Sequence, residues 1–469
     1  VYGISGEPAT FDPHMISDNI ASGIFYQVFD KLIRQETDGA LNPGLAESWT
    51  LSDDGTVVTF KIRKNVKFHN GDTLTADDVA FSLNRAIGSK FLASVVSMMD
   101  SAEVVDESTV NLKLKFSYGP IYYNITKISI VNKKAVEADA EGYGRKPIGT
   151  GAYKFVELKS GDKIVCERFD DYYRGPAPIK NLTFKIITDP STAVVALEKG
   201  EIDLLSAPAL AERQNLKSKA NIQYHETELN GNTYVAFNNT DGMFSNKKLR
   251  EAISYAIDKE TMLIGAVEGA GVAVNNAIPR DCFGYSEKVT ANPYDPEKAK
   301  QLLAEAGYPN GFTIKLKTME SATYYKPTEV LQDQLRQIGI TAEIEKMERG
   351  AYLSDVYTNA LYEMTIMSMV YGITDADSIY AFFHSDMIKN GQNFFRSNYK
   401  ELDELLDKGR RSSNQDERKE IYEKIGQFLN DEVVLIPLYS YFVAVAANKD
   451  LKGVKPSSIQ FYEVYSYSW

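Results

Sequence analysis

The sequence predicts an α/β fold with more than one domain, because helical and strand patterns alternate along much of the chain. Asp189–Pro190 marks the start of a helix that ends at Lys199–Gly200, and residues 202–205 follow as an apolar strand. A strand–helix–strand unit of this kind implies a sheet with helices packed on it and not a sandwich. The length of 469 residues, at roughly 150 residues per domain, suggests about three domains.

Residues 46–86 carry the clearest local pattern in the first part of the chain. Apolar residues alternate with polar ones over 58–62, which predicts a half-buried strand directly after a turn at Asp54–Gly55. Asn70–Gly71 predicts a second turn. Thr75 then precedes two acids and an apolar series, which predicts a capped helix start. The expected order is strand, turn, strand, turn, capped helix.

Helices and strands also take turns in residues 241–447. Ser245 is expected to cap a helix with apolar positions at spacings of three, four and seven residues. Asp295–Pro296 begins another helix, and 312–317 alternates as a strand. A further helix is predicted over 328–338, followed by an alternating strand. Near the end, the 15 apolar residues 433–447 contain Pro437, which predicts two buried strands around the proline and is too short for a membrane span.

Composition narrows the function classes. The chain is 43% hydrophobic and 25% charged, which is ordinary for a globular protein with a sizeable core. A net charge of −12 argues against nucleic acid and anionic membrane surfaces as partners. The 29 tyrosines suit a cleft for a polar ligand. Cys166 and Cys282 have no metal-site spacing, and we expect two unpaired thiols and no cofactor.

The sequence offers little for catalysis, and we do not expect an enzyme. The four histidines are scattered, without a pair at helical spacing for a metal; they are His14, His69, His225 and His384. Neither a nucleophile elbow nor a phosphate-binding loop is present. A carboxylate pair for glycoside hydrolysis stays open because acids are plentiful, so a hydrolase with an acidic cleft is one alternative.

Residues 46–86 also resemble a family signature, that of the family 5 extracellular solute-binding proteins, the peptide-binding receptors of ABC importers. The matching residues are Trp49, Asp54-Gly55-Thr56, Phe60, Val66-Lys67-Phe68-His69, Gly71 and Thr75-Ala76-Asp77-Asp78-Val79. Further landmarks of the family are matched at Gly149–Phe155 and Asp171–Gly175. The resemblance extends from Asp12 to the C-terminus.

The resemblance implies a two-lobed, periplasmic-binding-protein-like α/β fold of the cluster C type. An extra domain is inserted into the first lobe, and the ligand lies in the cleft between the lobes. Several crossings of the chain between the lobes would form a hinge. The expected divisions are domain I from 1–33, 153–240 and 448–469, domain II from 34–152, and domain III from 241–447.

The first candidate site follows an apolar strand that starts at Met364 and breaks at Gly372. Asp375 and Asp377 lie just past the strand end, where ligands gather in open α/β sheets. From the pattern alone, a helix cap is the alternative. The resemblance implies that Asp375 holds the α-ammonium group of a peptide, that Asp377 is a capping or structural acid, and that Tyr371 replaces an aromatic wall.

Other candidate residues also rest on the resemblance. Ser17, Asp18 and Asn19 match the loop whose backbone pairs with an extended peptide, although they also fit an ordinary helix cap. The segment after the strand at 312–317 lacks the arginine that binds a dipeptide carboxylate in the family. Glu320 is near that place, and Arg349 is a possible substitute.

The function implied is that of an extracytoplasmic receptor, periplasmic or lipid-anchored on the outer face of the cell membrane. It binds a di- or oligopeptide, closes and delivers it as a monomer to the transmembrane subunits of an ABC permease. One alternative keeps the receptor role for a non-peptide ligand such as a metal chelate, an oligosaccharide or a cationic metabolite. Another is a receptor that signals and does not transport.

Overall fold

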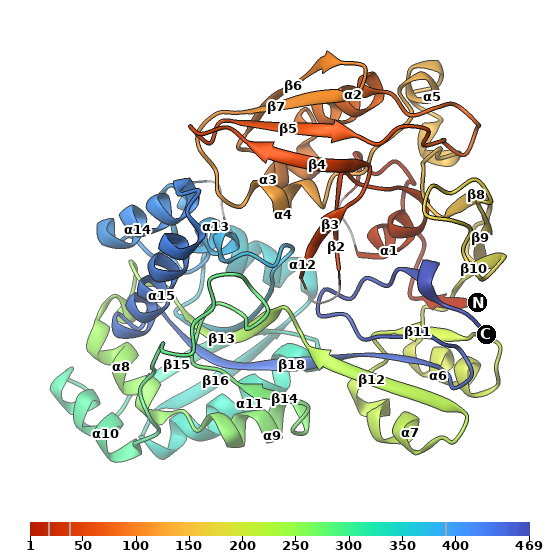
Figure 1. The fold of residues 1–469 in the computed structure, drawn as a ribbon. Coiled ribbons are helices and arrows are strands. Elements are labelled where there is room, and N and C mark those ends of the chain that lie inside the picture. Colours follow the sequence, from red (N-terminus) through yellow and green to blue (C-terminus); the bar gives the residue numbers. More distant parts are fainter. Residues whose placement is uncertain (17–18, 37–38, 390–391) are drawn as a thin grey trace. The chain divides into compact units, whose positions relative to one another are not determined.

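The computed structural model describes residues 1–16, 19–36, 39–389 and 392–469, which form two compact units (Figure 1). Unit 1 comprises residues 1–227 and 443–469, and unit 2 comprises residues 228–442. The chain passes from one unit to the other within β12 (Ile222–Glu228) and returns within β18 (Leu435–Asn448). The predicted α/β class with two units is confirmed, whereas the finer division into three domains stays a prediction.

The larger sheet of unit 1 has the strand order β18-β11-β1-β10-β9-β8. Its central strand β1 (Tyr2–Ile4) is parallel to β10 (Asn181–Ile186) on one side and to β11 (Leu204–Ser206) on the other. Helix α6 (Pro190–Glu198) connects β10 to β11, and the Asp189 side chain caps it by accepting the Thr192 amide at 2.7 Å. The predicted strand–helix–strand unit is therefore confirmed.

The smaller sheet of unit 1 confirms the order predicted for residues 46–86. It has the order β4-β5-β7-β6, and helix α2 packs on it (orange in Figure 1). Its core is built from residues 32–130 alone, whereas the other large core of unit 1 uses residues from both ends of the chain. The bounds are β4 Ala46–Leu51, β5 Val57–Ile62, β6 Met99–Asp106, β7 Thr109–Leu114 and α2 Ala76–Ile87.

The remaining elements of unit 1 are short or lie at the sheet edge. Strands β2 and β3 form a hairpin, and β8 and β9 end the larger sheet. The strands are β2 Ile33–Gln35, β3 Leu41–Pro43, β8 Tyr153–Lys159 and β9 Lys163–Arg168. The helices are α1 Asn19–Val28, α3 Ala93–Val96, α4 Ile121–Ile125, α5 Lys133–Ala138 and α7 Arg213–Ser218.

Unit 2 is built on the strand order β16-β15-β17-β13-β18, with β14 also paired to β18. Strand β15 is parallel to both β16 and β17, so these three strands end at the same edge. The strands are β13 Gly231–Phe237, β14 Gly271–Ala273, β15 Thr313–Met319, β16 Thr341–Met347 and β17 Met364–Val370. The helices are α8 Lys247–Ala256, α9 Lys259–Val267, α10 Pro296–Glu305, α11 Ala322–Gln337, α12 Arg349–Tyr352, α13 Tyr380–Phe383, α14 Lys400–Arg411 and α15 Gln415–Asp431.

Two predictions about unit 2 elements are wrong in their bounds. Asn246, and not Ser245, caps α8, because its side chain accepts the Lys248 amide at 3.0 Å. Helix α11 begins at Ala322 and continues through Pro327, whereas the helix was expected only from residue 328. Proline removes one helical hydrogen bond, but this proline is buried, so packing offsets the loss.

The two strands expected around Pro437 are one strand. β18 runs unbroken from Leu435 to Asn448, and Pro437 lies opposite Tyr234 of β13. The register of the β13–β18 pair shifts between Thr233 and Tyr234. Proline is tolerated in a sheet at such irregularities, because a ladder hydrogen bond is already missing there.

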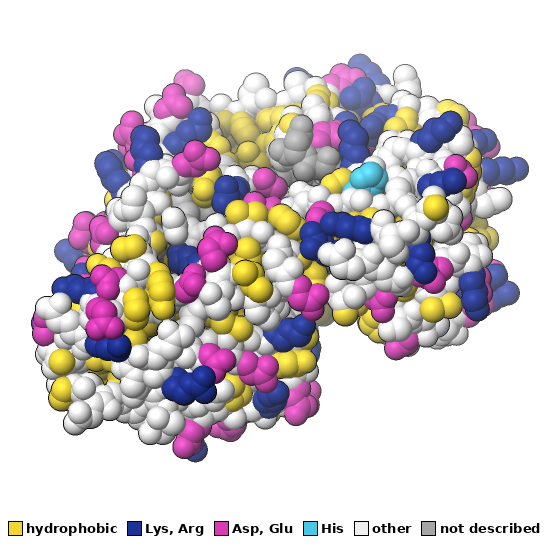
Figure 2. Space-filling model, turned by 90° about the horizontal axis from the view of Figure 1, so that it is seen from below, with side chains coloured by type: hydrophobic (Ala, Val, Ile, Leu, Met, Phe, Trp, Pro, Cys, Tyr) yellow, Lys and Arg dark blue, Asp and Glu magenta, His cyan; other side chains and the backbone are white. Residues whose placement is uncertain are grey.

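Cys166 and Cys282 are buried free thiols in different units, as expected. Side chains of both charge signs are mixed over the face that Figure 2 shows. Within the described part of the chain, no helix has the combined length and apolar character of a membrane span.

Candidate functional site

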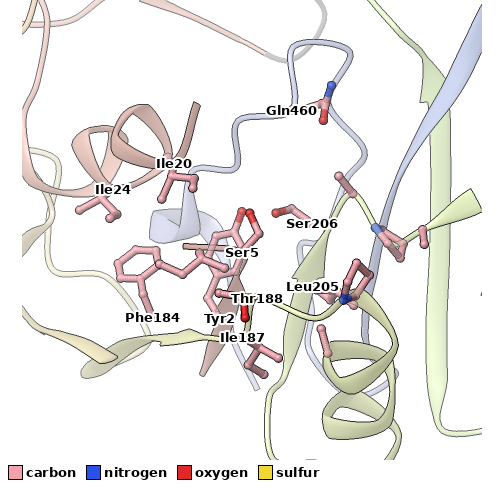
Figure 3. Close-up of a pocket in the computed structure, with 18 residues that line it drawn as sticks. Tyr2, Ser5, Ile20, Ile24, Phe184, Ile187, Thr188, Leu205, Ser206 and Gln460 are labelled. Carbon is pink, nitrogen blue, oxygen red and sulfur yellow. The ribbon is translucent and has the colours of Figure 1, made fainter. Parts of the chain in front are cut away.

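A pocket of about 280 Å³ lies at the carboxyl ends of the three parallel strands of unit 1 (Figure 3). Ser5 follows β1, Ile187 and Thr188 follow β10, and Ser206 ends β11. Ligands of open α/β sheets bind outside the carboxyl ends of parallel strands. This pocket is therefore the candidate ligand site of unit 1.

The pocket combines apolar walls with hydroxyl groups. Ile20, Ile24 and Phe184 lie on one side of it, while Ser5 and Ser206 lie nearer its centre (Figure 3). Such a lining suits a ligand with both apolar and hydrogen-bonding parts.

The surroundings of the pocket raise the pKa of Tyr2 and hold the backbone conformation of Ala207, two residues that line it. Burial raises the pKa of Tyr2 to about 12, and a hydrogen bond with Ser206 opposes that rise. Ala207 has a left-handed backbone with φ of 48°, held by its amide, which donates to the Ala444 carbonyl at 2.9 Å. A non-glycine residue in this conformation costs about 1–2 kcal/mol, and such strain clusters at functional sites.

The predicted backbone-pairing loop adjoins this pocket along the chain. Ser17 and Asp18 lie outside the described residues, and Asn19 is the first residue of α1. The next residues of that helix, Ile20, Gly23 and Ile24, line the pocket. Their role in pairing with a peptide stays a prediction.

In unit 2, four predicted residues follow the carboxyl ends of the three parallel strands. Glu320 comes directly after β15, Arg349 is the second residue after β16, and Tyr371 and Gly372 come directly after β17. The Glu320 amide donates to the Met347 carbonyl at 2.9 Å, which joins the ends of β15 and β16. The structure thus brings Glu320 and Arg349 to one sheet edge.

Glu320 and Arg349 are exposed charges of opposite sign. Within the described residues, neither side chain forms an ion pair. A second pair of charges comes from the same segments: the Lys317 ammonium group is 2.6 Å from a carboxylate oxygen of Asp355. Since Lys317 and Asp355 neutralise each other, Glu320 and Arg349 remain as exposed charges of opposite sign at this edge.

Asp375 is fully buried, and both of its carboxylate oxygens accept hydrogen bonds within the protein. Its two carboxylate oxygens accept hydrogen bonds from Arg418 at 2.7 and 3.0 Å, and one of them also accepts the Asp377 amide at 2.8 Å. Asp375 thereby caps the short 3₁₀ helix Ala376–Ile379, which confirms the helix-cap alternative. Burial raises the pKa of Asp375, and the guanidinium of Arg418 works against the rise.

Asp377 is bound in a second ion pair. It accepts hydrogen bonds from Arg410 at 3.0 and 3.1 Å, and the Tyr422 hydroxyl donates to it at 3.4 Å. The side chain is only 3% exposed. A ligand ammonium would have to displace Arg418 to reach Asp375, so the geometry favours a structural role for both acids over the ligand contact predicted for Asp375.

Tyr371 does not present its ring to solvent, and the predicted aromatic wall at this residue is corrected. The ring is 1% exposed and meets Phe382 edge-on at a centroid distance of 5.9 Å. Its hydroxyl donates to the Ala277 carbonyl at 3.2 Å. Gly372 is exposed, and a Cβ built there meets no atom within 4 Å, so this position has room for a side chain.

Sequence reasoning missed Arg418, the partner of Asp375. Arg418 is fully buried and lies on α15, 43 residues away along the chain. A signal was present, because Arg418 falls on the apolar stripe of the helix formed by Ile421, Ile425 and Leu429. A charged residue on such a stripe requires a buried partner.

The fold and the two strand-end sites define a binding protein of the two-unit α/β class. The family model for bacterial extracellular solute-binding proteins, family 5, matches residues 40–390. The chain therefore belongs to this family, whose members bind solutes outside the cytoplasm.

Relatives and a solved structure match along the whole chain. A protein of Haemophilus influenzae named heme-binding protein A is 28% identical, over 100% of this chain and 92% of the relative. The dipeptide-binding protein of Escherichia coli is 27% identical over 97% and 91%. The oligopeptide-binding protein AppA of Bacillus subtilis, solved with a nonapeptide, is 26% identical and superimposes with a TM-score of 0.80, covering 100% and 98%.

Proposed function

We propose that this protein is the peptide-binding receptor of an ABC importer. The observation that carries the proposal is the pair of exposed, opposite charges at the carboxyl edge of unit 2, Glu320 and Arg349. A peptide has one ammonium and one carboxylate group, and it also offers backbone groups between them. Relatives named for a dipeptide and solved with a nonapeptide support the ligand class.

We assign the ammonium contact to Glu320 in place of Asp375, because Arg418 already occupies both oxygens of Asp375. Arg349 then faces the ligand carboxylate or a backbone carbonyl, which a guanidinium binds well. Residues 17–19 pair with the peptide backbone. The bound receptor closes and delivers its ligand, as a monomer, to the transmembrane permease subunits, from the periplasm or from a lipid anchor on the outer face of the cell membrane.

The proposal is tested by isothermal titration of ligand-free protein, prepared by unfolding and refolding, with pentaalanine and its N-acetylated form. We expect pentaalanine to bind. Glu320→Gln should weaken its binding about tenfold, because the amide oxygen can still accept a hydrogen bond but the negative charge of the carboxylate is lost. N-acetylated pentaalanine should bind both proteins alike. Glu297→Gln, an exposed glutamate of α10 in the same unit, is the matched control.

A non-peptide ligand is the competing function, favoured by the relative named for heme. It is tested by titrating hemin into the same ligand-free protein and following the Soret absorbance. Saturable hemin binding, together with no binding of peptides two to nine residues long, would replace the peptide proposal.

A further inference from the structure

Six aromatic rings of unit 2 pack in one continuous series. The centroid distances between successive rings are 5.7, 6.0, 4.5, 5.9 and 5.9 Å. Four of these five contacts are edge-to-face, the arrangement that ring quadrupoles prefer. In order, this aromatic series consists of Tyr324, Tyr352, Tyr357, Phe394, Phe382 and Tyr371.

Every ring comes from a segment that follows one of the three parallel strands of unit 2. Tyr324 lies in the first turn of α11, after β15. Tyr352 ends α12, after β16, and Tyr357 lies in the π-helix Leu353–Thr358 that continues it. The other three rings follow β17. The series therefore belongs to the carboxyl edge that also carries Glu320 and Arg349, where a ligand is expected.

Two rings of the series, Tyr352 and Tyr371, are buried and held by hydrogen bonds. Tyr352 is fully buried, and its hydroxyl donates to the Ile366 carbonyl at 2.9 Å. Tyr371 is held in the same way by Ala277. Burial and a hydroxyl hydrogen bond hold each of these two rings in place before a ligand arrives. No ordering of them is needed on binding, and this preorganisation favours binding.

The other four rings are partly exposed: Tyr324, Tyr357, Phe382 and Phe394. The closest pair of the series, Tyr357 and Phe394 at 4.5 Å, is among them. Asp355, two residues before Tyr357, forms an ion pair with Lys317, so its negative charge is neutralised. The partly exposed part of the series is therefore mainly aromatic and apolar.

We propose that the aromatic series binds an aromatic side chain of the peptide, so that this receptor selects peptides that contain phenylalanine, tyrosine or tryptophan. The inference rests on the proposed peptide function and names its substrate class. A ring that adds to the series buries apolar area and also gains edge-to-face or offset contacts that an aliphatic side chain of similar size lacks. A carboxylate side chain would lose hydration against these rings without gaining a hydrogen-bond partner from them.

The test uses ten pentapeptides, in which one phenylalanine or one leucine is moved through the five positions of pentaalanine. Their dissociation constants are measured by isothermal titration with ligand-free protein. At one position at least, we expect phenylalanine to bind about tenfold more tightly than leucine. Phe394→Leu and Tyr357→Leu should each cut this advantage to about threefold or less.

Two control variants separate the series from general effects. Tyr357→Phe keeps the ring and should retain the preference for phenylalanine. Tyr294→Leu removes a ring that is 45% exposed in unit 2 and outside the series, and it should also retain the preference. The two leucine variants are independent, so a folding defect in one leaves the other to decide.

Each outcome bears on the inference. Equal binding of the phenylalanine and leucine peptides at every position would overturn it and leave the peptide function intact. A preference that survives both leucine variants would overturn the assignment to this series. If none of the ten peptides, pentaalanine or any di- to nonapeptide binds, the proposed function and the inference fail together.

Discussion

At the scale of single residues, Asp375 was predicted to contact the ligand, but in the structure its carboxylate forms a buried ion pair with Arg418. Both side chains are fully buried, and the carboxylate also caps a helix turn. Two charges without water are stable together only when their hydrogen bonds are complete. The sequence indicated the acid and its place after β17, but the arginine that binds it is brought there by the packing of α15.

We predict that Asp375→Ala lowers the free energy of unfolding by about 3–5 kcal/mol, because it leaves the Arg418 charge buried and unpaired. Chemical denaturation measures the loss, and the double change Asp375→Leu with Arg418→Met should recover part of it. Asp416→Ala is the control, because Asp416 is an exposed acid in the first turn of α15, the helix that carries Arg418. Loss of peptide binding at unchanged stability would instead restore Asp375 to the ligand site.

His69 is predicted to make stability depend on pH. One ring nitrogen lies 2.9 Å from the Gly151 carbonyl, and the other accepts the Gly149 amide at 3.4 Å, so the neutral ring satisfies both contacts. Burial lowers the pKa of His69 to about 4, against about 6.5 in the unfolded chain. The unfolded state therefore binds more protons between these values, and the stabilising contribution of His69 is complete above pH 6.5 and is lost as the pH falls towards 4.

His69→Gln removes this titration while offering similar hydrogen bonds. We expect the variant to lose less stability than the natural protein between pH 7 and pH 4, by up to about 3 kcal/mol. Unfolding free energies at half-unit pH steps provide the comparison. Parallel pH profiles for the two proteins would show that the ring is not held neutral.

At the scale of elements, helix α2 was the most predictable part of the chain because its start is defined by local chemistry. Thr75 and Asp78 form a reciprocal capping box, and Asp78 also accepts the Lys133 amide at 2.9 Å. Strand β18 was mispredicted, since a proline reads as a break unless the bulge opposite it is known. Likewise, Pro327 is buried within α11, and this burial depends on tertiary packing that the local sequence does not reveal.

The capping box yields a prediction for unit 1. Thr75→Ala should lower the free energy of unfolding by about 1 kcal/mol, because the Asp78 amide loses its acceptor. Thr75→Ser keeps the hydroxyl and should be nearly neutral. The melting temperatures of the three proteins, compared by calorimetry, test the pair, and an equal effect of alanine and serine would point to the lost methyl group instead.

At the scale of the whole molecule, the family block in residues 46–86 and the alternation of helices and strands were enough to predict an α/β binding protein. The candidate site was predicted only in part. Glu320 and Arg349 were identified and lie at one sheet edge, whereas the aromatic series was not anticipated, because its rings lie up to 70 residues apart in sequence, from Tyr324 to Phe394. Only the parallel register of β15, β16 and β17 brings them together.

A ligand that binds only the folded receptor must stabilise it. At a peptide concentration 100 times the dissociation constant, the gain is about 2.7 kcal/mol, and it grows with the logarithm of concentration. We expect the melting temperature of ligand-free protein to rise in this way with a phenylalanine-containing pentapeptide. A melting temperature that stays unchanged as the peptide concentration rises would mean that no specific complex forms.

The central claim is that the natural ligand is a peptide, and native mass spectrometry of the freshly purified protein, followed by denaturing analysis of what it releases, tests it most directly. The account predicts a set of masses that match short peptides, enriched in those with an aromatic residue. A single released mass that fits no peptide would contradict the claim.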